Sequence, residues 1–452
     1  MLQTIINALK VKEIRRKVYM MLLLLLVFRI GCFIPVPGLD RETFSTMFEG
    51  DNANDFLTLM SSLTGGALAS GTVFALGIGP YINASIIMQL LSVGIPSLER
   101  LSKQGEEGRK KIAQYTRYVT ILLAIIQSLG IIINFANQAE GALQITFFGD
   151  QTWLAYIFLT LIYTAGAFVV MWLGERITDY GVGNGQSMII FTGLIATAGS
   201  MILGKIRSIF DAATRTDLYP NSTSTDLVWE LIIFALICAI IFFAIVYVDL
   251  SERKVPVQYA KQIRGRKMYG GQSSSIPIRI SGGGVMPLIF AFSILSFPQM
   301  IGSMINGGDN GFVTWWNNWL SAGASGWGAV VYTVVLCVLI FAFAFFYAQM
   351  QFNPEDVSKS IQQNGGFIQG IRPGKATEAY LKKISNRITL FGAIYLSLVA
   401  FIPSGMFAWA DYTLVSVFST TGILIVVSCA MEFEKQLQAQ MMMKTYKGFL
   451  KK

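Results

Sequence analysis

The sequence predicts an all-α polytopic membrane protein, and two observations lead to that prediction. Hydrophobic residues make up 53% of the 452 residues, charged residues make up 13%, and the mean hydropathy is +0.55. A soluble globular protein of this length would not have that balance. In addition, apolar runs near the length that crosses a bilayer recur along the chain. About ten such runs lie at 18–36, 73–93, 112–135, 153–173, 186–204, 229–248, 285–303, 328–349, 388–408 and 412–431.

The hydrophobic stretch from Phe56 to Val93 is broken near its middle. Its first piece, Phe56 to Ser70, would span only about 22 Å as a helix, because a helix rises about 1.5 Å per residue. A hydrocarbon core about 30 Å thick needs about 20 residues, so this piece is expected to dip in and turn back at its glycines. The second piece, Val73 to Val93, is long enough to cross. Irregular backbone at membrane depth needs protein or a water-filled cavity around it, so the break predicts a cavity.

Basic residues gather in alternate linkers between the runs. They precede the first run and recur at 100–117, 253–279, 359–387 and 435–452. The opposite linkers carry only a few, namely Arg41, Lys205, Arg207 and Arg215. Because basic linkers stay on the cytoplasmic side, both termini are expected in the cytoplasm. For any individual Lys or Arg in these linkers, setting the orientation of the chain in the membrane is enough to explain its presence.

The linker at 205–228 divides the runs into two sets of five. We expect an N-terminal half at 1–204, an external hinge loop at 205–228, a C-terminal half at 229–431 and a cytoplasmic tail at 432–452. An odd number of spans inverts the second half relative to the first, which permits a pseudo-two-fold axis in the membrane plane. Sequence similarity between the halves is too weak to prove that relation.

Two cytoplasmic linkers, at 249–284 and 350–387, are longer than a connection between neighbouring helices needs. They are expected to protrude as a docking surface. The second contains Gly370-Ile-Arg-Pro-Gly374, where Pro373 and Gly374 favour a tight turn that presents Arg372 near a loop tip.

Several classes of chemistry lack candidate residues. The chain has no histidine, and its four cysteines lie singly in or beside apolar runs. We therefore expect no metal, no cofactor and no enzyme activity. An inverted-repeat transporter of a small solute is the alternative function, but it predicts ionisable groups near the midplane, and the run interiors hold only Arg29. An intramembrane enzyme would need a nucleophile and base that the runs do not supply.

Ile82 and Ile86 lie one helical turn apart and share a face of the second run. An aliphatic face that points into a cavity forms a dewetted constriction, which blocks ions without binding them. Ordinary packing against another helix explains the same spacing.

Several long motifs, in order from about residue 10 to the C-terminus, resemble the SecY family, the channel subunits of the bacterial Sec translocase. They are FRIGCFIPVPGLD (28–40), FALGIGPYINASIIMQLL (74–91), KQGEEGRKKIAQYTRY (103–118), MWLGERITDYGVGNGQS (171–187), GGVMPLIFAFSI (283–294), NPEDVSKSIQQNGGFIQGIRPG (353–374) and ILIVVSCAMEF (423–433).

The resemblance implies an hourglass-shaped protein-conducting channel with two five-helix halves and a lateral gate. Unfolded secretory polypeptides would cross through it, and membrane-protein segments would leave sideways. It implies SecE-like and SecG-like subunits, the SecA ATPase, the ribosome and signal peptides as partners, in the bacterial cytoplasmic membrane. The segment at about 56–70 corresponds to the plug, including Phe56, Leu57, Leu59, Leu63, Gly65 and Gly66.

The family's pore ring falls, motif by motif, on Ile82, Ile86, Gln186, Ile190, Ile289 and Ile425. Gln186 departs from the pattern, because the family usually has an aliphatic residue after Gly-Asn-Gly. An amide seeks water or a partner, which weakens a dry seal at that point. Either the seal depends more on the plug in this chain, or Gln186 turns toward the plug backbone.

The family's lateral gate lies between spans two, three, seven and eight. The resemblance places gate candidates at Gln89, Gln127 and Phe297, although simple hydrogen bonding between helices explains the two glutamines equally well. It places the surface that docks SecA or the ribosome at Arg253, Lys254, Arg264, Arg266, Lys267 and, above all, Arg372.

Overall fold

The computed structural model describes residues 2–39, 55–138, 152–214, 224–259, 262–264, 267–269, 273–280, 286–304, 311–320, 326–408 and 420–449. Contacts divide the chain into two units. The first comprises Met1–Ala235, Ser293–Tyr332 and Tyr412–Lys452, and the second comprises Leu236–Phe292 and Thr333–Asp411. These units do not follow the two halves expected from the sequence, whose boundaries stay a prediction.

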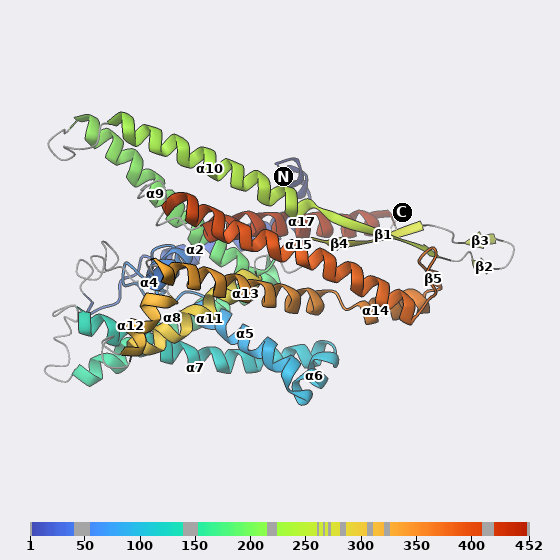
Figure 1. Cartoon of the computed structure of the whole chain (residues 1–452), viewed down its shortest axis with the longest axis horizontal. Helices are drawn as coiled ribbons and strands as arrows, with labels where there is room; N and C mark the ends of the chain where they lie inside the picture. The colour runs from blue at the N-terminus through green and yellow to red at the C-terminus, as the bar shows by residue number, and fades with distance from the viewer. Residues whose placement is uncertain are drawn as a thin grey trace. The chain divides into compact units, whose positions relative to one another are not determined.

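The described chain is mostly helical, and every predicted apolar run contains a helix (Figure 1). The helices are α1 Leu2–Lys10, α2 Lys12–Gly31, α4 Asp55–Thr64, α5 Gly79–Gly94, α6 Pro96–Lys103, α7 Glu106–Gln138, α8 Thr152–Tyr180, α9 Gly185–Thr214, α10 Ser224–Leu250, α11 Met286–Met304, α12 Gly311–Trp319, α13 Trp327–Gln351, α14 Pro354–Gln363, α15 Lys375–Ala408 and α17 Thr420–Phe449. Within the described residues, 4 helices are long and apolar enough to cross a membrane, or up to 5 if the bent pair α5 and α6 is one span.

The second predicted span begins later than expected. Helix α5 starts at Gly79 rather than Val73, has 16 residues, and bends by 101° into α6. The residues before it form turns, and Gly77 has a φ of 51°, a left-handed conformation that suits glycine. Pro80 occupies the first turn of α5, where its missing N–H costs nothing. Apolar composition alone did not distinguish these buried turns from a helix.

The buried core of the first unit joins the turns before α5 to helices α7 and α8. Leu68 and Leu76 from the turns lie in one hydrophobic cluster with Ile132 of α7 and Leu159 of α8. Gly166 of α8 allows the closest approach, because a Cβ there would lie 2.0 Å from the carbonyl oxygen of Val73. The irregular backbone is therefore packed directly against a helix.

The chain ends of the first unit also pack together. Ala8 and Ile14, from α1 and α2, share a hydrophobic cluster with Val182, in the turn between α8 and α9, and with Leu437 of α17. Helix α17 runs on to Phe449, so the described part of the predicted tail is helical.

The second unit contains strands that the sequence analysis did not predict. They are β1 Glu252–Tyr259, β2 Gln262–Arg264, β3 Lys267–Tyr269, β4 Ser273–Arg279 and β5 Gly366–Phe367. Strand β1 pairs antiparallel with β4 and with β5, in the order β4-β1-β5, while β2 pairs with β3. The two long linkers are thus joined in one sheet (Figure 1).

A hydrophobic core stabilises this sheet on one face. Val255 and Val257 of β1 are buried together with Ile361 of α14 and Leu381 of α15. Burial alternates along β1 with a period of two, as in a strand with one covered face. The linkers therefore form a small folded subdomain, which we call the linker subdomain (β1, β4, β5, α14 and the start of α15).

The packing at Gly166 gives a test of stability. Gly166→Ala should lower the free energy of unfolding by about 1–3 kcal/mol, because the added methyl overlaps backbone in a packed core. Gly199→Ala on α9 is the matched control, since nothing lies within 4 Å of its Cβ position. Thermal unfolding in detergent measures both variants. Equal midpoints for the two would contradict the close packing.

Candidate functional site

Helix α4 and the turns after it are held by side chains of α2 and α9. Arg29 Nη1 donates to the carbonyl oxygen of Gly65 at 3.4 Å, and Cys32 Sγ lies 3.8 Å from the carbonyl oxygen of Thr64. From the other side, Thr197 Oγ1 donates to the carbonyl oxygen of Ser62 at 3.1 Å. Arg29, which lies inside the first apolar run, thus pairs with a backbone carbonyl directly after α4.

Glycines allow α4 to approach its neighbours. A Cβ at Gly193 of α9 would lie 2.4 Å from the carbonyl oxygen of Leu63, and one at Gly79 of α5 would lie 2.6 Å from Met60 Cε. Helix α4 ends at Thr64, and the chain turns at Gly65 and Gly66, whose φ angles are 72° and 82°. The predicted turn at these glycines is confirmed.

The predicted plug residues are only partly described. Phe56, Leu57 and Leu59 belong to α4, but their side chains lie outside the described part of the chain. Leu63 is half-buried. The described contacts of α4 therefore come from residues near its C-terminal end.

The predicted pore-ring residues of the first unit come from three helices. Ile82 is half-buried and Ile86 buried on α5, while Ile190 of α9 and Ile425 of α17 are both buried. Helices α9 and α17 pack together. Ile289 is buried on α11 in the second unit.

Gln186 lies at the start of α9. Its backbone N–H donates to Asn184 Oδ1 at 3.1 Å, which caps α9. Its side chain is half-buried and lies beside Gly174 of α8, where an added Cβ would be 3.5 Å from Gln186 Cγ. A seal that depends more on the plug, and an amide turned toward the plug backbone, both stay predictions.

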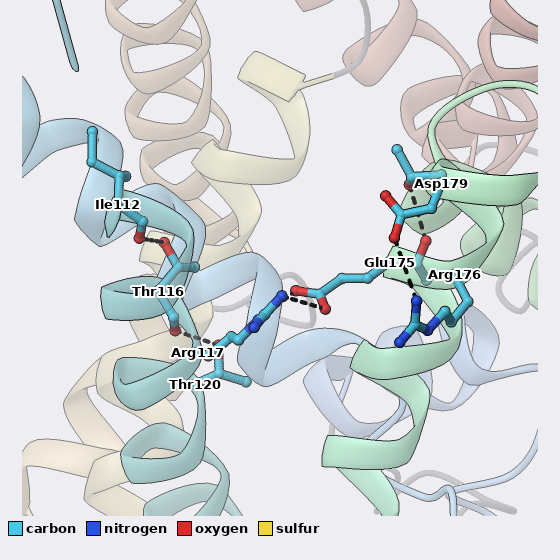
Figure 2. A network of polar contacts seen from close by, with 9 residues as sticks. Ile112, Thr116, Arg117, Thr120, Glu175, Arg176 and Asp179 are labelled. Atoms are coloured by element: carbon cyan, nitrogen blue, oxygen red, sulfur yellow. Dashed lines mark hydrogen bonds and ion pairs between the residues drawn. The ribbon is translucent and has the colours of Figure 1, made fainter. Parts of the chain in front are cut away.

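Arg117 of α7 and Glu175 of α8 form an ion pair that the sequence analysis did not predict. Figure 2 shows Arg117 reaching Glu175, with Nε and Nη2 donating to the two carboxylate oxygens at 2.8 and 2.9 Å. Arg176 lies 3.8 Å from Asp179 and 5.5 Å from the centre of the Trp172 ring. Arg117 had been read only as one of the basic residues that set topology. No local pattern reveals a partner so distant in the sequence.

The structure describes the side chains of two of the three predicted gate residues, Gln89 and Gln127. Gln89 Nε2 donates to Ser85 Oγ at 3.2 Å within α5, which is a contact inside one helix. Gln127 is buried on α7, and within the described residues its Oε1 has no hydrogen-bond partner. Phe297 lies on α11, but its side chain lies outside the described part. A gate between helices therefore stays a prediction.

The tight turn around Arg372 is present as predicted. Gly370 and Gly374 have φ angles of 82° and 97°. Thr377 Oγ1 donates to the carbonyl oxygen of Arg372, and Ser358 Oγ to that of Gly374, both at 2.9 Å. The backbone is fixed by these bonds, whereas the Arg372 side chain is exposed.

The other predicted docking residues follow the strands of the second unit. Arg253 and Lys254 are exposed on β1, and Lys254 lies 3.4 Å from Glu252. Arg264 and Lys267 face each other in the register of β2 and β3, while Arg266 lies outside the described residues. On α14, hydrogen bonding to Glu355 raises the pKa of Lys359, so that side chain stays protonated at neutral pH.

Comparison with known proteins identifies the family of the chain. The family model for SecY matches residues 72–434. The protein translocase subunit SecY of Halalkalibacterium halodurans is 40% identical over 452 residues, which is 100% of both chains.

Two solved structures share the fold. A SecY protein whose plug domain stabilises the closed state of the translocation channel matches with a TM-score of 0.66 and 21% identity over 94% of this chain and 92% of that chain. Sec61 in a canine ribosome–channel complex matches with a TM-score of 0.63 and 19% identity over the same shares, 94% and 92%. Given the family model and the full-length relative, the chain belongs to the SecY family.

Proposed function

We propose that this chain is the central protein-conducting channel subunit of a bacterial Sec translocase. It passes unfolded secretory polypeptides across the cytoplasmic membrane and releases membrane-protein segments through a lateral gate. The observation that carries the proposal is the short helix α4, which is held inside the first unit by a few polar contacts and by glycines. The full-length similarity to a translocase subunit supports it.

Helix α4, with the turn after it, acts as the plug. A hydrogen bond between protein groups contributes about 1 kcal/mol net, so bonds such as those from Arg29 and Thr197 are weak enough to break during opening. The Gly193 contact leaves no side chain to unpack when α4 moves away. A segment held in this way closes a channel reversibly.

The seal around the plug is a ring of aliphatic side chains from Ile82, Ile86, Ile190, Ile289 and Ile425, with Gln186 as its polar member. Aliphatic rings exclude ions by dewetting and do not bind them. The buried positions of Ile86, Ile190 and Ile425 within the first unit are compatible with this role.

The linker subdomain is the cytoplasmic docking surface for the SecA ATPase and the ribosome. Arg372, Arg253 and Lys254 are its main basic residues, and Arg264, Arg266 and Lys267, which lie between β1 and β4 in the sequence, extend the basic set. A fixed backbone beneath an exposed guanidinium lowers the entropy cost of binding an acidic or phosphate partner. The excess of basic residues in this and the alternate linkers places both termini in the cytoplasm, and SecE-like and SecG-like subunits complete the channel.

A transporter of a small solute has no support from the comparisons. The family match and the full-length relative both concern the SecY translocase.

Removal of the plug should open the resting channel to ions. Deleting Phe56 to Thr64 removes α4 and keeps the buried Ala67 and Leu68 in the chain. We expect a higher ion leak from vesicles that contain the purified complex, with unchanged membrane insertion. Conductance equal to that of the unmodified chain would argue against a plug.

A single methyl on α9 should weaken the seat of the plug. Gly193→Ala places a Cβ 2.4 Å from the carbonyl oxygen of Leu63, so α4 must shift and the leak should rise. Gly199→Ala on the same helix meets nothing within 4 Å and serves as control. Leak rates in the same vesicles measure both, and a tight Gly193→Ala channel would refute the proposed seat.

Charge reversal at the docking turn should uncouple the motor. Arg372→Glu should weaken SecA or ribosome binding by about ten-fold to a hundred-fold, the value of a charged hydrogen bond. The copurified small subunits should remain. Lys375→Glu, an exposed reversal nearby, is the control and should have a smaller effect. Binding is measured with purified partners, and equal affinities for Arg372→Glu and the unmodified chain would exclude the docking role.

A further inference from the structure

Aromatic side chains line one side of the short helix α12. Phe312, Trp315, Trp316 and Trp319 stand at positions i, i+3, i+4 and i+7, which share one side of an α-helix. We call these four residues the aromatic face. Their rings lie close together, because the centres of Phe312 and Trp316 are 5.6 Å apart and those of Trp315 and Trp316 are 6.2 Å apart. Helix α12 is therefore amphipathic, with an apolar side made of aromatic rings.

The described part of the chain leaves most of the aromatic face uncovered. Phe312 and Trp315 are each 51% exposed, Trp319 is 42% exposed, and only Trp316 is half-buried. The opposite side of the helix carries polar, uncharged residues, among them Asn318, which is exposed. A contiguous patch of exposed aromatic rings marks a surface that another apolar phase or molecule covers.

The place of α12 in the chain favours the membrane surface as that cover. Only residues 305–310 separate it from α11, and only residues 320–326 separate it from α13. Both neighbours lie in apolar runs, and α13 is long and apolar enough to cross a membrane. Even a fully extended chain of these lengths reaches at most about 30 Å. Helix α12 therefore stays near the membrane surface from which α11 and α13 enter.

The aromatic face is continuous in character with the start of α13. That helix begins at Trp327, which is 78% exposed, and Val330 one turn later is 50% exposed. The described residues leave most of the apolar stretch of α13 unburied, as expected for a helix that faces lipid. Tryptophan is enriched where a membrane helix meets the water interface. The same depth suits the rings of α12.

The charge of this linker indicates which kind of surface α12 fits. Residues 305–326 contain no Lys or Arg, and Asp309 is the one acidic residue in that sequence. Helices that bind anionic lipids carry basic residues on their polar side. Helix α12 has none, so the aromatic rings alone must provide the attraction. That chemistry suits the interface of zwitterionic phospholipids.

We propose that α12 is an interfacial anchor, which lies in the plane of the membrane surface with its aromatic face among the phospholipid headgroups and the first carbons of the acyl chains. Asn318 and the rest of the polar side face water. The anchor fixes the depth of the adjoining ends of α11 and α13, because such a helix slides within the interface more readily than it leaves it. The inference goes beyond the channel function and needs only that α11 and α13 lie in the membrane.

Two adjacent positions on opposite sides of α12 test the anchor. Trp319→Cys and Asn318→Cys are each labelled with the fluorophore NBD, in the full chain with its copurifying subunits, and reconstituted in phosphatidylcholine vesicles. Both residues are exposed in the structure, so without a membrane both labels would meet water equally. The unmodified chain, whose cysteines at 32, 238, 337 and 429 are buried or half-buried, gives the background labelling.

The two labels should respond to opposite quenchers. Spin-labelled phosphatidylcholine should quench the label at 319 several-fold more than the label at 318, and iodide on both sides of the membrane should do the reverse. Equal quenching of both by iodide would place the aromatic face in water and overturn the anchor. A label at 319 that neither quencher reaches would show that a protein covers the face, which also overturns it.

Two controls keep the result specific. Val338→Cys on α13, where the native side chain is 62% exposed, carries the same label and reports contact with lipid in each preparation. If Trp319→Cys does not assemble, Trp315→Cys on the same face replaces it. The measurement does not use ion flow. A failed anchor therefore leaves the channel function standing, and a plug deletion that does not leak leaves the anchor standing.

Discussion

Irregular backbone inside an apolar protein must find its hydrogen bonds within the protein, and much of this structure follows from that constraint. The turns between α4 and α5 satisfy it locally and through the end of α2. Gly66 N–H donates to the carbonyl oxygen of Ser61 at 2.8 Å, and Val73 N–H to that of Ile34 at 3.0 Å. Without these partners each buried group would cost about 1–3 kcal/mol. The break in the second hydrophobic stretch is therefore stable only because α2 and its extended end lie beside it.

The same constraint explains where small residues occur on the neighbouring helices. Turns carry carbonyl groups outward, so a helix that packs against them has no room for a Cβ. Gly166 of α8 faces the carbonyl oxygen of Val73, and Gly193 of α9 faces that of Leu63. The first contact belongs to the permanent core, whereas the second holds the proposed plug. Close packing at glycine thus stabilises the core at Gly166 and holds the movable segment of the proposed channel at Gly193.

The polar contacts between helices of the first unit are of two types, charged pairs and single uncharged or singly charged hydrogen bonds, and the charged pairs hold their helices more firmly. Arg117 and Glu175 join α7 to α8 through a charged, bidentate pair. The contacts that Arg29 and Thr197 make with α4 and the turn after it are single hydrogen bonds. In the second unit, the pairing of Gln258 with Phe367 joins two linkers that are far apart in the sequence. The exposed Arg372 therefore lies on a folded support rather than on a loose loop.

The sequence by itself determined the positions of the apolar helices, the turn at Gly65 and Gly66, and the turn that presents Arg372. These features depend on local composition, on chain length against bilayer thickness, and on glycine and proline geometry.

Tertiary structure alone decided where α5 begins, which strands form, and which carboxylate pairs with Arg117. Buried turns and a buried helix have the same apolar composition, so hydropathy placed the start of α5 too early. Strand β1 pairs with β5, and Arg117 binds Glu175, and in each case the partner is distant in the chain. A hydrogen bond between distant residues leaves no periodic pattern in the sequence, so only the fold reveals it.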